Sequence, residues 1–428
     1  MKRIIIKNFG AIKYFEMDLK KVNILIGPQA SGKSTIAKSL FLVESVQKEL
    51  IEYIKNISSR NEITHLLQYF NKRLKSFFVE IFGTTKHMNR FEIEFIISKD
   101  KNLKFYLTND GWVKIKYSEL LKKEIENLKN DLNEFLKLNR ELELNPFDDK
   151  NTTKRIYVFK NISKRIDDIF GSKTTIEYIP AGRSLLTVFA EQIGEINRTK
   201  LDLITKRYIE KIINLKKIFV DDLNMILENY KRYDIQKIDF KRVNLAIETI
   251  QKILKGNYKF KDGEERIYFE KNRYVKINFA SSGQQEAVWI LNQIYYLILH
   301  NISTFLIVEE PEAHLYPEAQ KNIVELMCLF GNKTNNSLLI TTHSPYILSS
   351  LNNLLYAGRL YKNGFDVDFI DKYFTINIDN VNAYFIENGK KIDIIDYDLG
   401  EIKAEAIDSA SEIINSEYNR LLDIENVW

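Results

Sequence analysis

The strongest signal in this 428-residue sequence is Gly27-Pro28-Gln29-Ala30-Ser31-Gly32-Lys33-Ser34-Thr35, which fits the pattern G-x-x-x-x-G-K-[ST]. Residues 22–26 before it form a short apolar run typical of a buried strand, and residues 34–46 after it show apolar positions at helical spacing. The two glycines let the backbone turn with its N–H groups facing inward, beside the positive end of the helix. A chance glycine-rich turn would lack the flanking strand and helix, so the pattern predicts a phosphate-binding P-loop.

The predicted P-loop offers several groups to a nucleotide. The Lys33 ammonium can reach the β- and γ-phosphates, and the Ser34 hydroxyl can ligate Mg²⁺. Backbone N–H groups of the loop complete the phosphate cradle. The residues that we expect at the phosphates are Gly27, Ala30, Ser31, Gly32, Lys33, Ser34 and Thr35.

Composition limits the class of protein. The chain is 45% hydrophobic and 12% aromatic, enough for one large domain or two to three smaller ones. The net charge of +5 permits a nucleic-acid partner, although a balanced solvated surface explains it better. The single cysteine, Cys328, cannot form an internal disulfide, which fits a reducing cytosol. No apolar run approaches the roughly 20 residues of a membrane span, and the apolar part of the N-terminus is too short for a signal peptide. We therefore expect a cytoplasmic protein with no membrane partner.

Hydrophobic periodicity predicts the remaining elements. Strands are expected at residues 3–7, 14–19, 91–98, 103–107, 112–117, 174–179, 258–261, 266–270, 274–278, 384–386 and 392–395. Helices are expected at residues 49–55, 63–82, 118–142, 199–230, 238–255, 287–299 and 401–422. Residues 143–153 form a polar break that contains Pro146.

A second motif, Ser281-Ser282-Gly283-Gln284-Gln285-Glu286, lies between a predicted strand and the apolar helix 287–299. Serine and glycine at a helix N-terminus offer N–H groups and a hydroxyl to an anion. Alone, the motif would be an ordinary N-cap. Its position in the chain relative to the other motifs distinguishes it from an ordinary N-cap.

Two apolar strands in the last third of the chain end in polar residues. Residues 304–312 end in Glu309 and Glu310, which we expect at the carboxyl edge of the sheet beside the P-loop. One carboxylate can hold Mg²⁺ and the other can orient the attacking water, although two such carboxylates could also form only a solvated turn. Residues 337–345 form a second such strand, and His343 at its end can bind the γ-phosphate or the water. A lone histidine would more often be structural.

Together, the P-loop, the S-S-G-Q-Q motif, the Glu-Glu-Pro strand and the Thr-His-Ser strand resemble the ATP-binding-cassette ATPases. The resemblance is to the soluble RecF/SMC/OLD-like branch, and it covers residues 1–45 and 274–350. It implies ATP and Mg²⁺, with Ser282, Gly283 and Gln285 as a signature motif that contacts the γ-phosphate of ATP bound to a second subunit. The signature departs from L-S-G-G-Q at Ser281 and Gln284.

The resemblance also implies roles for the two polar strand ends. Glu309 corresponds to the Mg²⁺-side acid, Glu310 to the catalytic glutamate and His343 to the switch histidine. Residues 312–317 resemble a loop that contacts the second subunit of a dimer. The family's Q-loop glutamine has no clear counterpart, and Arg183 in that region could either face a phosphate or be structural.

The fold class that these observations predict is α/β: an ABC-ATPase (P-loop) head with a mixed sheet, plus a mostly helical insertion. The head is assigned to residues 1–46 and 258–428, and the insertion, a short meander with a helical subdomain, to residues 47–257. Within that span, the segment 174–184 is assigned to the head.

The function implied is that of an ATPase switch forming a homodimer or higher homo-oligomer through composite ATP sites. No nuclease activity is expected within this chain, because Asp366 and Asp368 are interpreted as loop acids and the five histidines form no metal-ligand cluster. Stand-alone ATPases of this branch resemble the subunits of Septu- and PARIS-type phage-defence systems, which work with a separate effector protein. The alternatives are a RecF-like DNA-repair ATPase, for which nucleic acid would be the partner, and an ATP-gated scaffold that sequesters a toxin.

Overall fold

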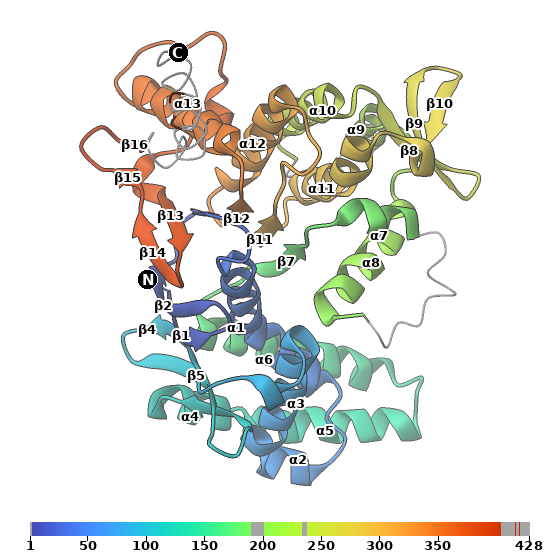
Figure 1. Ribbon diagram of the computed structural model, residues 1–428. Coiled ribbons are helices and arrows are strands. Elements are labelled where there is room, and N and C mark those ends of the chain that lie inside the picture. The colour runs from blue at the N-terminus through green and yellow to red at the C-terminus, as the bar shows by residue number, and fades with distance from the viewer. Residues whose placement is uncertain (1, 190–200, 233–237, 404–415, 417–418, 420–428) are drawn as a thin grey trace.

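The computed structural model describes residues 2–189, 201–232, 238–403, 416 and 419. It confirms the predicted α/β class with a mixed sheet (Figure 1). Most of the helix predicted at 401–422 lies outside the described residues. Within the described part of the chain, no helix is long and apolar enough to cross a membrane.

A six-stranded sheet forms the centre of the molecule. Five of its strands are parallel and one edge strand is antiparallel. The three central strands are buried except for Ser337 at the start of β12, which explains why they appear in the sequence as mostly apolar runs. The spatial order is β14 (Lys390–Asp393), β13 (Val381–Glu387), β3 (Val22–Ile26), β12 (Ser337–Thr342), β11 (Thr304–Glu309) and β7 (Thr175–Ile179).

Side chains alternate between the two faces of this sheet. Leu306 and Val308 pack into the core on one face, and Phe305 and Ile307 into the core on the other. The first core is covered by helices drawn above the sheet in Figure 1 and the second by those drawn below it. The molecule therefore has three layers, with a core on each side of the sheet.

A second, antiparallel sheet has the order β2 (Ile12–Asp18), β1 (Arg3–Phe9), β4 (Glu92–Ser98), β5 (Lys101–Leu107) and β6 (Val113–Tyr117). The sequence predicts the meander 91–117 within the insertion, whereas in the structure β4 pairs directly with β1. This pairing covers the edge of β1, which would otherwise expose unpaired backbone groups. The boundaries proposed at 46/47 and 257/258 remain a prediction.

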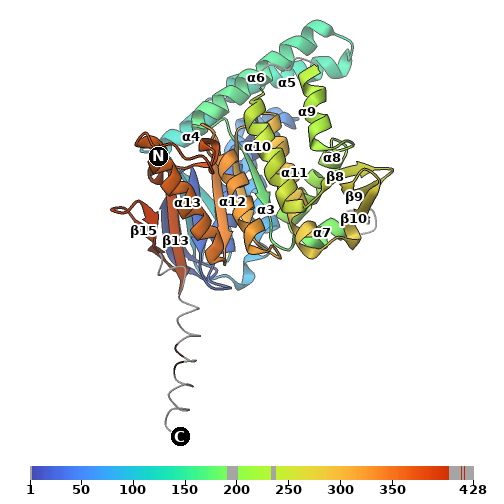
Figure 2. The ribbon, with the colours of Figure 1, turned by 90° about the horizontal axis from the view of Figure 1, so that it is seen from above.

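The helix α1 (Lys33–Lys55) runs between the two sheets as one element, although two segments were expected. Its buried face continues through Val46, Leu50 and Ile54, so packing carries the helix across the predicted break. The other helices on this side are α2 (Arg60–Thr64), α3 (Leu66–Phe82), α4 (Glu119–Glu126), α5 (Lys129–Leu144) and α6 (Asp149–Phe170). The polar break predicted at 143–153 is shorter in the structure, because α5 continues to Leu144 and α6 begins at Asp149; the two helices project together in Figure 2.

The opposite face carries the remaining helices and a small sheet. The helices are α7 (Arg183–Phe189), α8 (Leu203–Lys216), α9 (Leu223–Arg232), α10 (Phe240–Leu254), α11 (Ser282–Leu299), α12 (Pro317–Gly331) and α13 (Pro345–Lys362). The strands of the small sheet are β8 (Asn257–Lys261), β9 (Glu264–Glu270) and β10 (Arg273–Lys276), and β15 (Ile395–Asp396) pairs with β16 (Glu401–Ile402).

Candidate nucleotide site

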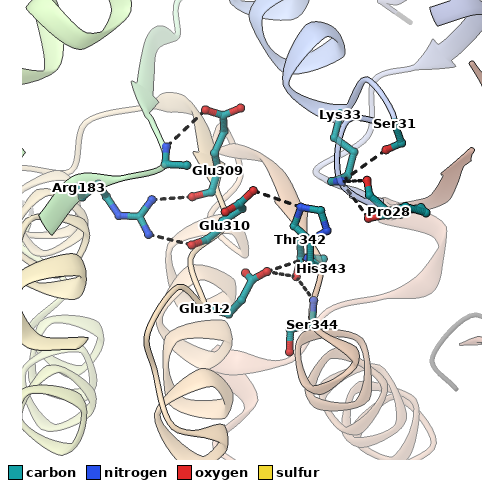
Figure 3. A network of polar contacts seen from close by, with 12 residues as sticks. Pro28, Ser31, Lys33, Arg183, Glu309, Glu310, Glu312, Thr342, His343 and Ser344 are labelled. Carbon is teal, nitrogen blue, oxygen red and sulfur yellow. Dashed lines mark hydrogen bonds and ion pairs between the residues drawn. The ribbon is translucent and has the colours of Figure 1, made fainter. Parts of the chain in front are cut away.

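The carboxyl ends of the parallel strands bring the predicted site residues to one edge of the central sheet. In the register of the sheet, Ile26 lies opposite Thr342, and Thr341 lies opposite Glu309. The P-loop follows Ile26, the carboxylates end β11 and His343 follows β12. These three groups therefore lie together at the edge where open α/β sheets bind their ligands (Figure 3).

The glycines of the P-loop are required by close contacts. Gly27 has φ 153° and Gly32 has φ 104°, a range that residues with side chains rarely adopt. A Cβ atom on Gly27 would overlap the carbonyl oxygen of Ile386, and one on Gly32 would overlap the side chain of Ile12. The loop therefore packs tightly against β13 and β2, as well as turning sharply.

Lys33 is held at the mouth of the loop. Its Nζ donates hydrogen bonds to the carbonyl oxygens of Gly27 (2.9 Å) and Pro28 (2.8 Å) and lies 3.5 Å from the Ser31 hydroxyl (Figure 3). The side chain is buried, and burial lowers the pKa of Lys33. Three nearby carboxylates act in the opposite direction and favour the charged form. A cation is thus positioned where the pattern predicted contact with phosphates.

Glu309 is a buried acid at the end of β11. One carboxylate oxygen, Oε2, accepts a long hydrogen bond of 3.4 Å from the backbone N–H of Ala181. The other, Oε1, is buried and makes no hydrogen bond of normal geometry with any residue that the structure describes. Burial, followed by the neighbouring Glu309 carboxylate, raises the pKa of the Tyr178 phenol, which keeps that group neutral. Glu309 therefore places a buried carboxylate oxygen, beside the Tyr178 phenol, where it could bind a cation.

The polar groups at this edge of the sheet fit Mg²⁺ better than they fit a transition metal. Over residues 2–189, 201–232 and 238–403, no cluster of three or more His, Cys, Asp or Glu side chains could hold a metal. Mg²⁺ does not need such a cluster, because it is bound through one or two protein ligands together with phosphates and water. Glu309 and the exposed Ser34 hydroxyl at the first turn of α1 are suitable ligands.

Glu310 and His343 lie in direct contact. The Oε1 atom of Glu310 lies 3.2 Å from Nε2 of His343. The backbone of Glu310 has φ 44°, and its N–H donates to the carbonyl oxygen of Thr341 at 2.8 Å. A left-handed conformation costs a residue with a side chain about 1–3 kcal/mol and occurs often at functional sites. The turn after β11 thus directs the Glu310 carboxylate toward the histidine.

The signature-like residues form the N-terminal turn of α11. Ser281 and Gln284 form a capping box, in which each side chain bonds the backbone N–H of the other. The Gln285 amide donates to carbonyl oxygens of residues 277 and 280 in its own chain. A Cβ on Gly283 would lie 2.7 Å from the carbonyl oxygen of His314, so the glycine packs against the 312–317 loop.

Arg183 has a structural position, which resolves the alternative left open by the sequence. Its guanidinium is completely buried and donates to the carbonyl oxygens of Pro180 (2.7 Å), Glu309 (2.6 Å) and Glu310 (2.8 Å). It also forms an ion pair of 3.2 Å with the buried Glu286 of α11. Arg183 therefore fixes the turn that carries the two carboxylates, and its donors face protein carbonyls.

Sequence reasoning missed the roles of Glu286 and Glu312. Glu286 accepts hydrogen bonds from the backbone N–H groups of Arg183 (3.1 Å) and Ser184 (2.9 Å). Glu312 binds the end of β12, as described below. Glu286 is 103 positions from its partner, and no local pattern predicts such a contact.

Three comparisons place the chain among known proteins. Residues 1–348 match the family described as AAA ATPase domain. A curated relative, the lipoprotein-releasing system ATP-binding protein LolD of Neorickettsia sennetsu, is 24% identical over 91 residues, which are 21% of this chain and 38% of LolD. The chain thus spans little more than a third of that relative.

Solved structures with detectable similarity include SMC heads. The SMC head domain from Thermotoga maritima shares 10% identity, with a TM-score of 0.37 over 92% of this chain and 98% of its own. An SMC head bound to the C-terminal winged-helix domain of ScpA shares 11% identity, with a TM-score of 0.39 over 81% of this chain and 90% of its own. At these scores the assignment of the fold rests on the sheet topology and the site geometry.

Proposed function

The chain belongs to the AAA ATPase domain family, and we propose that it is a Mg²⁺-dependent ATPase in which ATP closes two copies of the chain into a switch. The observation that carries this proposal is the contact between Glu310 and His343, at the sheet edge that also holds Lys33. A carboxylate in contact with a histidine, close to a phosphate-binding lysine, is suited to orienting water for attack on the γ-phosphate.

Each group has a distinct task in this proposal. Lys33 and the loop N–H groups bind the phosphates and compensate their negative charge. Ser34 and Glu309 hold Mg²⁺, which neutralises charge on the phosphate oxygens when bound. Glu310 accepts a hydrogen bond from the attacking water, and His343 restricts the rotamers of the Glu310 carboxylate.

Self-association follows from the count of motifs in the sequence. The chain has one P-loop and one signature-like motif, on different elements. Two copies related by a two-fold axis would place the Ser282 turn of each copy against the ATP of the other. Exposed apolar side chains near this turn, Phe279 and Tyr316, are suited to such an interface.

Replacing Glu310 with Gln tests the proposal. Glu310→Gln should retain ATP binding and lower kcat about 10²–10⁴-fold, because the amide cannot act as the water-orienting base. Lys33→Ala should lose nucleotide affinity. The matched control is Glu318→Gln, the same change at an exposed site in α12, which should hydrolyse ATP like wild type. Equal turnover by wild type and Glu310→Gln would refute the assigned role.

The partner is proposed to be a separate effector protein, as in the phage-defence ATPases that the motif order resembles. Figure 2 shows α5 and α6 projecting together. Support comes from the segment that joins them, in which Leu144 is 88% and Phe147 is 92% exposed. Apolar side chains at the end of a projecting helix pair favour a protein over the phosphates of a nucleic acid.

Co-purification with the product of a neighbouring gene distinguishes the two partners. A protein held by apolar contacts should remain bound at raised salt and after nuclease treatment, whereas phosphate binding falls steeply with salt. If only nucleic acid co-purifies, and is lost at raised salt, the RecF-like alternative replaces the effector proposal.

A further inference from the structure

The loop between β11 and α12 connects the carboxylates to an exposed surface. Glu310 and His314 in this loop have positive φ angles, 44° and 59°, so its path is strained at two places. His314 and Tyr316 are exposed, while the carbonyl of His314 packs against Gly283 of the signature-like turn. The loop therefore contacts the signature-like turn on one side and β12 on the other.

Glu312 makes the contact with β12. Its Oε1 atom accepts a hydrogen bond of 2.7 Å from the Thr342 hydroxyl and one of 2.8 Å from the backbone N–H of His343 (Figure 3). Its Oε2 atom accepts none within the part of the chain that the structure describes. Both hydrogen bonds of the carboxylate thus go to the strand end from which the His343 ring projects.

Further polar contacts close a ring around this junction. The Thr342 hydroxyl accepts from the backbone N–H of Ser344 at 2.9 Å, and the Ser344 hydroxyl donates to Gln320 at 2.6 Å. Gln320 donates to the carbonyl oxygen of Leu315 at 2.8 Å, and the N–H of Leu315 donates to the carbonyl oxygen of Glu312 at 2.9 Å. The ring joins the loop, the end of β12 and the first turns of α12 and α13 into one unit.

We propose that Glu312 is a positioning residue that sets the distance between His343 and Glu310. Since β12 ends at Thr342, the N–H of His343 lies beyond the sheet, and Glu312 is the group that fixes it. Misplacing a reacting group by about 1 Å can cost about 10²-fold in rate, so a bond to the histidine backbone can matter as much as one to its ring. This inference rests on the proposed ATPase mechanism, in which His343 restricts Glu310.

The catalytic test compares Glu312→Ala with Glu312→Gln. Glu312→Ala should lower kcat about 10–100-fold, because it removes positioning, and any change in the Kd for ATP caused by loss of the negative charge near Lys33 should be the same in Glu312→Gln. Glu312→Gln should recover most of this loss, since its amide oxygen can accept the same two hydrogen bonds. Glu318→Ala is the matched control in α12 and should match wild type. Should Glu312→Ala fail to fold, Glu312→Asp replaces it, because the shorter side chain cannot keep both bonds.

A double-mutant cycle separates positioning from general destabilisation. If Glu312 acts through His343, Glu312→Ala should cause no further loss of kcat in a His343→Ala background. If the fold-losses of kcat in the two single variants multiply in the double variant, the inference is overturned.

A spectroscopic readout keeps this inference distinguishable from the ATPase proposal. In protein labelled at its five histidines, the ring signal of His343, assigned by its absence in His343→Ala, should shift in Glu312→Ala and not in Glu312→Gln. An unchanged His343 signal in Glu312→Ala would overturn the positioning role even if wild type hydrolyses ATP. Absence of hydrolysis by wild type would instead refute the proposed function, and the signal would still decide the contact.

Discussion

Arg183→Ala should lower the free energy of unfolding more than the substitution of an exposed residue does. This effect should be seen in the nucleotide-free protein. The wild-type guanidinium is completely buried and donates to four carbonyl oxygens, one of them the backbone carbonyl of Glu286, in addition to its ion pair with the Glu286 carboxylate. Removing it takes a donor away from each of those carbonyls, although Glu310 still accepts from the N–H of Ala313, and leaves the Glu286 carboxylate, 2% exposed, without its counter-charge. Two backbone N–H bonds to Glu286 remain and soften the loss.

The size of the effect follows from these contacts. Removing one partner of a buried ion pair costs about 3–5 kcal/mol, a large part of the about 5–15 kcal/mol that stabilises a typical protein. An unfolding entropy of about 2.1 cal/mol/K per residue corresponds to about 0.9 kcal/mol/K for 428 residues that unfold together. The melting temperature should therefore fall by about 3–6 °C. Because the double variant with Glu286→Gln removes the unpaired charge, it should lose less than the sum of the single variants.

Thermal unfolding followed by tryptophan fluorescence measures this loss, since Trp289 is buried in α11, the helix that carries Glu286. Arg90→Ala, at an exposed arginine, is the control and should unfold within about 0.5 kcal/mol of wild type. If Arg183 instead bound phosphate, Arg183→Ala would weaken ATP binding and leave the melting temperature of the nucleotide-free protein unchanged. That result would refute the structural role assigned to Arg183.

Two further substitutions test the composite site and the loop geometry. Ser282→Arg, introduced into Glu310→Gln protein, should abolish ATP-induced dimers in light scattering while the P-loop still binds nucleotide; a Glu310→Gln protein that is monomeric with and without ATP would contradict the composite site. Gly27→Ala should reduce ATP affinity at least about 10-fold by calorimetry, because φ 153° and the nearby carbonyl of Ile386 exclude a Cβ, and unchanged affinity would show that the loop tolerates it.

The central fold could be predicted because its signals are local. The three central parallel strands are mostly apolar runs, and the P-loop pattern specifies its own strand, turn and helix. Elements whose limits depend on tertiary packing were predicted less well. The helix α6 has a narrow buried face of Val158, Ile162 and Ile166 among lysines and polar residues, and no element was assigned to its C-terminal part. The pairing of β4 with β1 joins residues about 90 positions apart, which strand periodicity cannot reveal.

The position of the candidate site could also be predicted from local signals. Strand ends at one sheet edge implied that Glu310 and His343 lie near the P-loop, and the structure places their side chains 3.2 Å apart. The residues that hold them there could not be found in this way. Arg183 reaches its partners across more than a hundred positions, and Glu312 contacts a strand end 30 positions away. Contacts of this kind arise only when distant segments fold together.

Three contacts hold residues 309–316, which include Glu310 and the rest of the loop between β11 and α12. Arg183 ties its backbone to Glu286 on the signature-like helix, Gly283 packs against it, and Glu312 ties it to the end of β12. A second molecule that presses on the signature-like turn would therefore be expected to move Glu310 and His343 together. ATP can drive such a movement only to the extent that it binds the two arrangements with different affinity, typically by about 1–3 kcal/mol. In the proposed switch, the rigidity of these links would determine how much of that free energy reaches the proposed partner.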